Sequence, residues 1–318
     1  MTSASAGGRD GQTMSGDSLL VRYLNFVKLP HTLFALPFAL VGATLASYTR
    51  PVTWASLGWI VAAFTAVRFA AMGFNRIVDR DIDARNPRTA GRELPKGTLT
   101  LRQASAAVAV ASLFFVYAAW QLNPLCGWLS PIALGWVLAY SYTKRFTRWS
   151  HLVLGVSLSI APVGGYLAIA GQWSEPRWML LVLAAAVSSW VAGFDVLYAL
   201  QDRTFDVAQG LHSIPVAFGA ERAVRISRAL HAVTVVSLVA VGWSTGAGWL
   251  YAVGVGVSAL LLLYEHSLVK PDDLRRLDAA FFTMNGVISI AFFVFVLAER
   301  IMRMGDGVTH VVRSAVLS

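Results

Sequence analysis

Long apolar runs joined by short polar connections follow one another through almost the whole chain. A helix needs about 20 apolar residues to cross a bilayer, with a usable range of about 17–25. Runs of this length lie at 30–49, 54–76, 104–122, 125–141, 151–171, 177–200, 222–244, 247–265 and 279–301. Strands of a membrane barrel would instead be about 10 residues long and alternate in polarity. The pattern therefore predicts an all-α polytopic membrane bundle of about nine transmembrane helices.

The composition agrees with a protein embedded in a lipid bilayer. Apolar residues make up 56% of the chain and charged residues 14%, whereas soluble domains have about 45–50% and about 25%. These values exclude an ordinary soluble protein, and intrinsic disorder would need low hydrophobicity and high net charge. Residues 1–18 are small and polar, so we expect a disordered N-terminal tail, a transmembrane domain over 19–303 and a C-terminal tail over 304–318.

The positions of Lys and Arg predict how the bundle is oriented. Most of the 26 basic residues lie in segments that would share one side of the membrane with the N-terminus. Cytoplasmic loops carry an excess of Lys and Arg, so we expect an integral protein of a bacterial inner membrane with a cytoplasmic N-terminus. The basic C-terminal tail is discordant. The basic residues occupy separate short loops, which suits contact with anionic lipid and argues against a nucleic-acid partner.

Acidic residues gather at the ends of two predicted helices. A helix C-terminus favours cations over anions, so acids placed there twice suggest a positive partner. These residues are Asp79, Asp81 and Asp83 at the end of the second predicted helix, and Asp195, Asp202 and Asp206 at the end of the sixth.

The spacing within each cluster predicts which acids share a face. Asn75, Asp79 and Asp83 are four residues apart, and such residues neighbour one another on a helix. The acids at 195, 202 and 206 would share about one face of a continuous helix with 3.6 residues per turn. Hard oxygen ligands of this kind suit Mg²⁺, which binds through one or two carboxylates and substrate phosphates. Two facing clusters could hold two Mg²⁺ ions that bridge one diphosphate.

A structural alternative remains open for the same acids. Each carboxylate could form a salt bridge with a neighbouring arginine such as Arg80, Arg85 or Arg203. Because ionisable residues in or near membrane spans are costly, they are functional candidates by default.

Three stretches resemble signature segments of the UbiA-type membrane prenyltransferases. Residues 75–95, N-R-I-V-D-R-D-I-D-A-R-N-P-R-T-A-G-R-E-L-P, resemble the family's first aspartate-rich motif, NDxxDxxxD. Residues 195–215 resemble the second, YAxQDxxxD, and residues 140–147, Y-S-Y-T-K-R-F-T, resemble the basic loop after the fourth helix. Arg76 stands where the first motif has Asp, and Arg occurs there in the 4-hydroxybenzoate branch.

The resemblance implies Mg²⁺-dependent transfer of a polyprenyl group from an allylic polyprenyl diphosphate to an aromatic acid such as 4-hydroxybenzoate, in ubiquinone biosynthesis. It implies an active site open to the cytoplasmic side. The metal ligands that it implies are Asn75, Asp79, Asp83, Asp195, Asp202 and Asp206, of which the five aspartates would also be catalytic.

The resemblance also implies substrate-binding residues beside Asn75. Lys144 and Arg145, with Tyr140 nearby, would hold the leaving diphosphate, although Arg145 could equally be an ordinary positive-inside residue. Arg68 lies about two turns before Asn75 inside the second helix. It would bind the carboxylate of the aromatic acceptor, or else form a structural pair with an acid of the bundle.

Other interpretations stay open at this point. Arg88 and Arg92 follow the first motif and are by default solvated loop charges. The acceptor could be 1,4-dihydroxy-6-naphthoate in a menaquinone route, because Arg68 suits either carboxylate. An ion- or proton-coupled transporter would place its acids near the bilayer midplane, on broken helices in two matching halves.

Overall fold

The computed structural model describes residues 18–27, 35–269, 277 and 283–317, and the regular elements in this part of the chain are all helical. The elements are α1 (Leu19–Phe26), α3 (Leu36–Ala46), α4 (Trp54–Arg85), α5 (Leu101–Leu122), α6 (Pro124–Ala139), η1 (Tyr140–Arg145), α7 (Ser150–Ala170), α8 (Trp178–Tyr198), η2 (Ala199–Asp202), α9 (Arg203–Ala208), α10 (Ile214–Phe218), α11 (Ala220–Ser244), α12 (Trp249–Leu268) and α13 (Asn285–Leu317).

Seven helical stretches are long and apolar enough to cross a membrane, and each matches a predicted run. Runs 30–49 and 279–301 each include residues outside the described part of the chain. Their described portions form α3, which has 11 residues, and the first turns of α13. The all-α membrane bundle is confirmed. The predicted tail at 1–18 lies almost wholly outside the described residues, and the predicted boundary at 303 falls inside α13.

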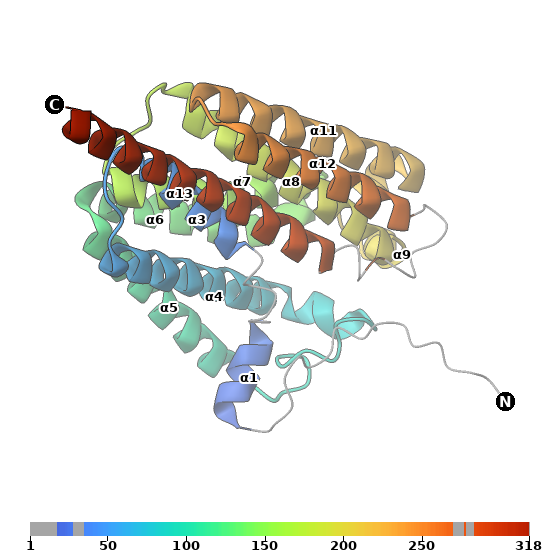
Figure 1. The fold of residues 1–318 in the computed structure, drawn as a ribbon. Coiled ribbons are helices and arrows are strands. Elements are labelled where there is room, and N and C mark those ends of the chain that lie inside the picture. The colour runs from blue at the N-terminus through green and yellow to red at the C-terminus, as the bar shows by residue number, and fades with distance from the viewer. Residues whose placement is uncertain (1–17, 28–34, 270–276, 278–282, 318) are drawn as a thin grey trace.

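Helix α8 lies at the centre of the bundle (Figure 1). It packs against α7 on one side and α11 on the other, while α4 pairs with α5 and α12 pairs with α13. Two-thirds of the apolar window in α8 is buried, the largest share among the seven spans. The apolar residues of α8 therefore serve the protein core, and those of the outer helices mainly face the surroundings.

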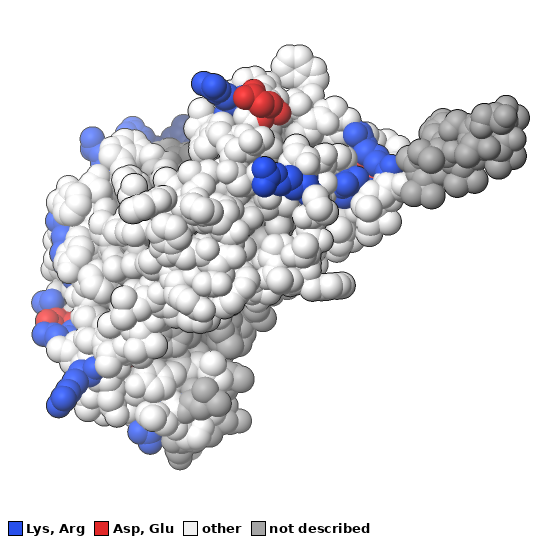
Figure 2. Space-filling view, turned by 90° about the vertical axis from the view of Figure 1, so that its left-hand side faces the viewer, with Lys and Arg blue, Asp and Glu red and all other residues white. Residues whose placement is uncertain are grey.

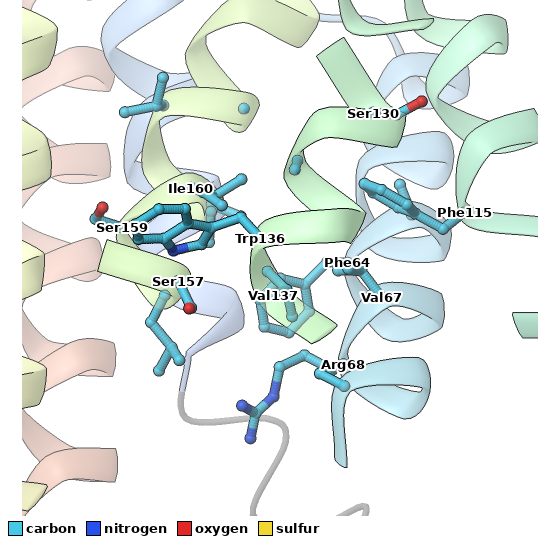
Figure 3. Close-up of a pocket in the computed structure, with 18 of the residues that line it drawn as sticks. Phe64, Val67, Arg68, Phe115, Ser130, Trp136, Val137, Ser157, Ser159 and Ile160 are labelled. Carbon is cyan, nitrogen blue, oxygen red and sulfur yellow. The ribbon is translucent and has the colours of Figure 1, made fainter. Parts of the chain in front are cut away.

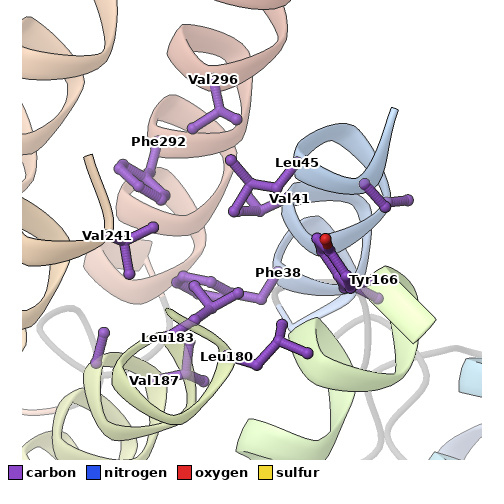
Figure 4. Close-up of a cluster of buried hydrophobic side chains, with 14 of the residues drawn as sticks. Phe38, Val41, Leu45, Tyr166, Leu180, Leu183, Val187, Val241, Phe292 and Val296 are labelled. Atoms are coloured by element: carbon purple, nitrogen blue, oxygen red, sulfur yellow. The ribbon is translucent and has the colours of Figure 1, made fainter. Parts of the chain in front are cut away.

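The core forms where α3 packs together with α7, α8 and α13 (Figure 4). The rings of Phe38 on α3 and Trp190 on α8 have centroids 4.7 Å apart. Close approach of α3 and α7 depends on Gly42 and Gly165, because each faces backbone atoms of the other helix. Small residues at helix crossings are the usual means by which membrane helices pack closely.

The outer surface is suited to lipid. Figure 2 shows a face on which a broad area carries no charged side chain and the Lys and Arg residues lie around its margins. Trp54, Trp243 and Trp249 are exposed at the helix ends opposite the acidic residues of α4. Tryptophan is enriched where a membrane meets water, so these residues mark one interface of the bundle.

The polar end lies opposite this tryptophan-rich end. In Figure 1 the segment after α4 and the short helix α9 lie at the same end of the bundle. The first predicted acidic cluster lies in the last turns of α4, directly before this segment, and the second runs from the end of α8 through η2 to α9. The fold therefore brings the two clusters to one end, as the sequence predicts.

Candidate active site

The last turns of α4 carry the first acidic cluster on one face. Asn75 Nδ2 donates to Asp79 Oδ2 at 3.2 Å, and Asp79 and Asp83 are both buried. Asp81 points away from them: its side chain is 79% exposed and pairs with Arg80, which is itself half exposed. The predicted face of Asn75, Asp79 and Asp83 is confirmed, because α4 stays regular through these residues.

The second cluster does not lie on a continuous helix. Helix α8 ends at Tyr198, the 3₁₀ segment η2 follows, and α9 begins at Arg203. The prediction that Asp195, Asp202 and Asp206 share one α-helical face is wrong, since a 3₁₀ turn has about three residues and rotates the chain out of register. The three acids come from three successive elements.

The loop after α4 joins the two clusters. Arg88 binds Asp202 through two hydrogen bonds, Nε to Oδ1 at 3.0 Å and Nη2 to Oδ2 at 2.6 Å. Asn86, the C-cap of α4, donates to the same carboxylate at 3.2 Å. Burial disfavours the charged form of Arg88, but the hydrogen bonds and charge of Asp202 outweigh burial and raise the pKa of the guanidinium.

Two further charged residues of the loop, Arg92 and Glu93, bind the first motif. Arg92 Nη1 lies 2.9 Å from Asp83 Oδ2, and the buried pair of Arg76 and Glu93 is 2.6 Å apart. The default interpretation of Arg88 and Arg92 as solvated charges is therefore wrong. Burying a charge is costly unless it has a partner. These ion pairs therefore hold the loop against the bundle.

The acids do form salt bridges, but not with the arginines closest in sequence. Among the described residues Arg80 pairs with exposed Asp81, and Arg85 and Arg203 donate to the backbone oxygens of Asp81 and Pro215. Asp79 is paired instead by Lys144 and Arg145 of η1. Asp83 and Asp202 are paired by Arg92 and Arg88 of the segment after α4.

The 3₁₀ segment η1 supplies two cations to Asp79. Lys144 Nζ lies 2.6 Å from Asp79 Oδ2, and Arg145 Nη2 lies 3.0 Å from Oδ1. Arg145 also donates to the backbone oxygens of Ser141 and Val78, so it is more than a positive-inside residue. Tyr140 interacts electrostatically with acids of both clusters, Asp79 and Asp195.

Asp195 and Asp206 complete the polar end. His151 Nδ1 lies 2.6 Å from Asp195 Oδ2. Asp206 interacts electrostatically with Asp202, Lys144 and His151. The structure thus brings together all the acids proposed from the sequence except Asp81, in alternation with basic side chains.

A cavity of about 570 Å³ begins beside this polar end. Arg68, Asn75, Arg76, Arg92 and Tyr140 line it together with many apolar residues of α4, α5, α6 and α7. Figure 3 shows Arg68 extending from α4 at one end of the pocket, with Phe64, Val67, Trp136 and Val137 beyond it. The cavity has the form expected for a ligand with a polar head and a long apolar tail.

Arg68 has polar capacity that the protein does not use. Its Nη2 donates to Met72 Sδ at 3.5 Å, and its Nε is buried without a hydrogen-bond partner. No acidic side chain in the described ranges forms an ion pair with it. The predicted structural alternative, a pair with an acid of the bundle, is therefore not found among the described residues.

The donor set fits Mg²⁺ held jointly with an anionic substrate. In the described part of the chain no three His, Cys, Asp or Glu side chains form a group that could hold a metal unaided. Mg²⁺ needs only one or two carboxylates when phosphates supply further oxygens. Lys144, Arg88 and Arg92, which now pair with the acids, have the donors that phosphate oxygens accept.

Sequence reasoning missed two contributors to this site, His151 and Asn86. His151 is an ionisable residue at the start of an apolar run, which is a signal that could have singled it out. Asn86 ends a helix and has no such signal.

Comparison with known proteins agrees with the motifs. The profile of the UbiA prenyltransferase family matches residues 35–287. A 4-hydroxybenzoate octaprenyltransferase from Aromatoleum aromaticum is 31% identical, covering 73% of this chain and 77% of that protein. One from Alcanivorax borkumensis is 34% identical, covering 68% of this chain and 74% of that protein.

Solved structures show the same fold. A UbiA homolog from Aeropyrum pernix K1 superposes with a TM-score of 0.76 at 36% identity, covering 86% of this chain and 98% of that one. A UbiA homolog from Archaeoglobus fulgidus bound to GPP and Mg²⁺ has a TM-score of 0.66 at 19% identity, covering 88% and 99%. The chain, with its motifs, fold and family match, belongs to the UbiA prenyltransferase family.

Proposed function

We propose that this chain transfers a polyprenyl group from an allylic diphosphate to an aromatic carboxylic acid of the 4-hydroxybenzoate kind. The observation that carries the acceptor assignment is Arg68, a guanidinium with an unused buried donor at the wall of a largely apolar cavity. An arginine fork matches a carboxylate in shape and charge. The names of the relatives, 4-hydroxybenzoate octaprenyltransferases, support the same acceptor class.

The donor would lie across the polar end and the cavity. Its diphosphate would lie among Lys144, Arg145, Arg88 and Arg92, and its chain would follow the apolar walls that Figure 3 shows. Mg²⁺ held by the aspartates and Asn75 would neutralise the diphosphate and make it a better leaving group. The GPP and Mg²⁺ in the Archaeoglobus fulgidus homolog support this assignment.

In the reaction that we propose, the bond between the allylic carbon and the diphosphate oxygen breaks and the basic side chains stabilise the departing charge. The ring carbon ortho to the acceptor hydroxyl then bonds to the allylic carbon. A carboxylate of the second cluster accepts the proton that is released. Arg68 fixes the orientation of the acceptor, because binding one end of a small ring sets the position of the other.

We also propose that the protein lies in a bacterial inner membrane, with the N-terminus and the polar end on the cytoplasmic side. The distribution of Lys and Arg supports this orientation. It leaves the site open to a soluble aromatic acid and to a membrane-held prenyl chain.

The structure favours a transferase over a transporter. The break at η2 follows 21 residues of α8, a full span, and lies beside basic loops. A transporter would be expected to break its helices near the midplane, where its coupling ions bind.

An acceptor screen tests this proposal. Purified protein in detergent would receive one radiolabelled allylic diphosphate, Mg²⁺ and either 4-hydroxybenzoate, 1,4-dihydroxy-6-naphthoate or benzoate. We expect a prenylated product from a hydroxylated acid, none from benzoate and none when a chelator removes the metal. The preferred hydroxylated acid identifies the acceptor. Failure of every acid to react would contradict the proposal.

Arg68→Ala is expected to weaken acceptor binding selectively. Hydrogen bonds to charged groups contribute about 1.5–3 kcal/mol, so KM for the aromatic acid should rise about ten- to a hundredfold. KM for the diphosphate should change little. Arg80→Ala is the matched control, since Arg80 lies on the same helix and pairs with exposed Asp81. Equal increases in both KM values would rule out the carboxylate assignment.

A further inference from the structure

His151 connects three elements at the polar end. It is the second residue of α7, is 4% exposed and contacts Asp195 of α8 through Nδ1. On its other side, Nε2 accepts a hydrogen bond from the backbone N–H of Ile214 at 3.3 Å. Ile214 is the first residue of α10.

These two contacts determine where the ring proton is. A backbone amide can only donate, so Nε2 must present its lone pair to Ile214. The single proton of a neutral ring then lies on Nδ1 and is donated to Asp195 Oδ2. A doubly protonated ring would place a proton against the Ile214 N–H, so the geometry requires the neutral Nδ1–H tautomer.

The amide whose hydrogen bond His151 accepts belongs to the first turn of α10, where N–H groups have no carbonyl acceptor within the helix. In the same turn Pro215 has no N–H, and the N–H of Val216 donates to Ser213 Oγ at 3.3 Å. Without His151, the N–H of Ile214 would be buried and unpaired, which is costly. His151 therefore fixes the start of α10 as well as the carboxylate.

The segment before α10 also contacts the basic stretch 140–147. The N–H of His212 donates to the backbone oxygen of Lys144 at 2.8 Å. His151 thus links Asp195 to the segment that supports Lys144, the cation nearest to Asp79. The His151 ring therefore connects Asp195 to the backbone that carries Lys144, whose side chain pairs with Asp79.

We propose that His151 is a positioning residue for Asp195. As the Nδ1–H tautomer it holds Oδ2 and would leave Oδ1 available to the diphosphate and its cation, an inference that rests on the proposed function. A hydrogen-bond donor behind a metal-binding carboxylate fixes its orientation, and loss of such a partner costs about 10–100-fold in metal affinity or activity.

The tautomer can be tested without substrate or metal. We would record nitrogen–proton NMR spectra of protein carrying ¹⁵N-labelled histidine, one of six such residues being His151. At neutral pH we expect one ring with a proton on Nδ1 only, whose signals disappear in His151→Gln and shift in Asp195→Asn. A ring protonated on Nε2, or on both nitrogens, would overturn the proposal.

Kinetics with two matched variants test the positioning role. Gln offers an N–H for Asp195 and an oxygen for Ile214, whereas Leu offers neither and has a similar size. We expect His151→Leu to raise the Mg²⁺ concentration for half-maximal rate and to lower kcat by about 10–100-fold. We expect His151→Gln to remain within a few-fold of wild type, with KM for the aromatic acid unchanged in both.

The outcomes separate this inference from the proposed function. A merely structural His151 would lower Tm in the Leu variant without moving the Mg²⁺ dependence, and that result would refute the positioning role. Equal activity of wild type and His151→Leu would also refute it. If wild type itself formed no product, the proposed function would fail, and the NMR result would still decide the tautomer.

Discussion

Asp79→Asn is expected to abolish turnover. The Asp79 side chain is 2% exposed and faces Lys144 and Arg145 at 2.6 and 3.0 Å. Asn keeps the shape but removes the charge, so two cations lose their counter-ion and the proposed Mg²⁺ site loses a ligand. A loss of about 4 kcal/mol in transition-state stabilisation corresponds to about a thousandfold in rate, and we expect kcat to fall by at least that factor.

Asp81→Asn is the matched control for this prediction. Asp81 lies two residues further along α4, is 79% exposed and pairs with Arg80. The same chemical change there should leave kcat and KM at wild-type values. Product formation would be measured with the hydroxylated acid that reacts best, and Tm would show that both variants fold. Wild-type turnover by Asp79→Asn would exclude the role assigned to the first cluster.

The parts of the site that the sequence predicted are those governed by local periodicity. Asn75, Asp79 and Asp83 share a face because α4 remains regular from Trp54 to Arg85. The membrane spans were predictable for a similar reason, since length and hydropathy belong to each segment separately. Arg68 could be singled out because it is a charged residue inside a predicted span, about two turns before Asn75.

The parts that the sequence did not predict depend on contacts between distant segments. The 3₁₀ turn at η2 takes Asp202 off the face of α8, and no residue in that stretch signals it. Arg88 reaches Asp202 across 114 positions, and His151 reaches Asp195 across 44. Pairing of this kind follows from tertiary packing. The sequence alone suggested only the arginines that lie close to the acids along the chain, such as Arg80 and Arg203.

The second large effect is expected in the fold, where Gly165→Ala should severely destabilise the bundle. A Cβ at Gly165 on α7 would clash with the backbone oxygen of Ala39 on α3. A backbone atom cannot turn aside as a flexible side chain can, so α3 and α7 would have to separate. This separation would also cost Phe38 of α3 and Tyr166 of α7, which Figure 4 shows in this core, some of their packing contacts.

The expected size of the effect follows from the cost of overpacking, which is about 1–3 kcal/mol and occasionally more. Because separation of two core helices belongs at the upper end, we expect Tm in detergent to fall by on the order of 10 °C. Gly164→Ala is the matched control: it is the neighbouring residue of α7, and a Cβ there would meet nothing within 4 Å. Ala is favoured over Gly in a helix by about 1 kcal/mol, so this variant should be as stable as wild type or slightly more so. Equal Tm values for the two variants would show that α3 and α7 do not depend on close contact at Gly165.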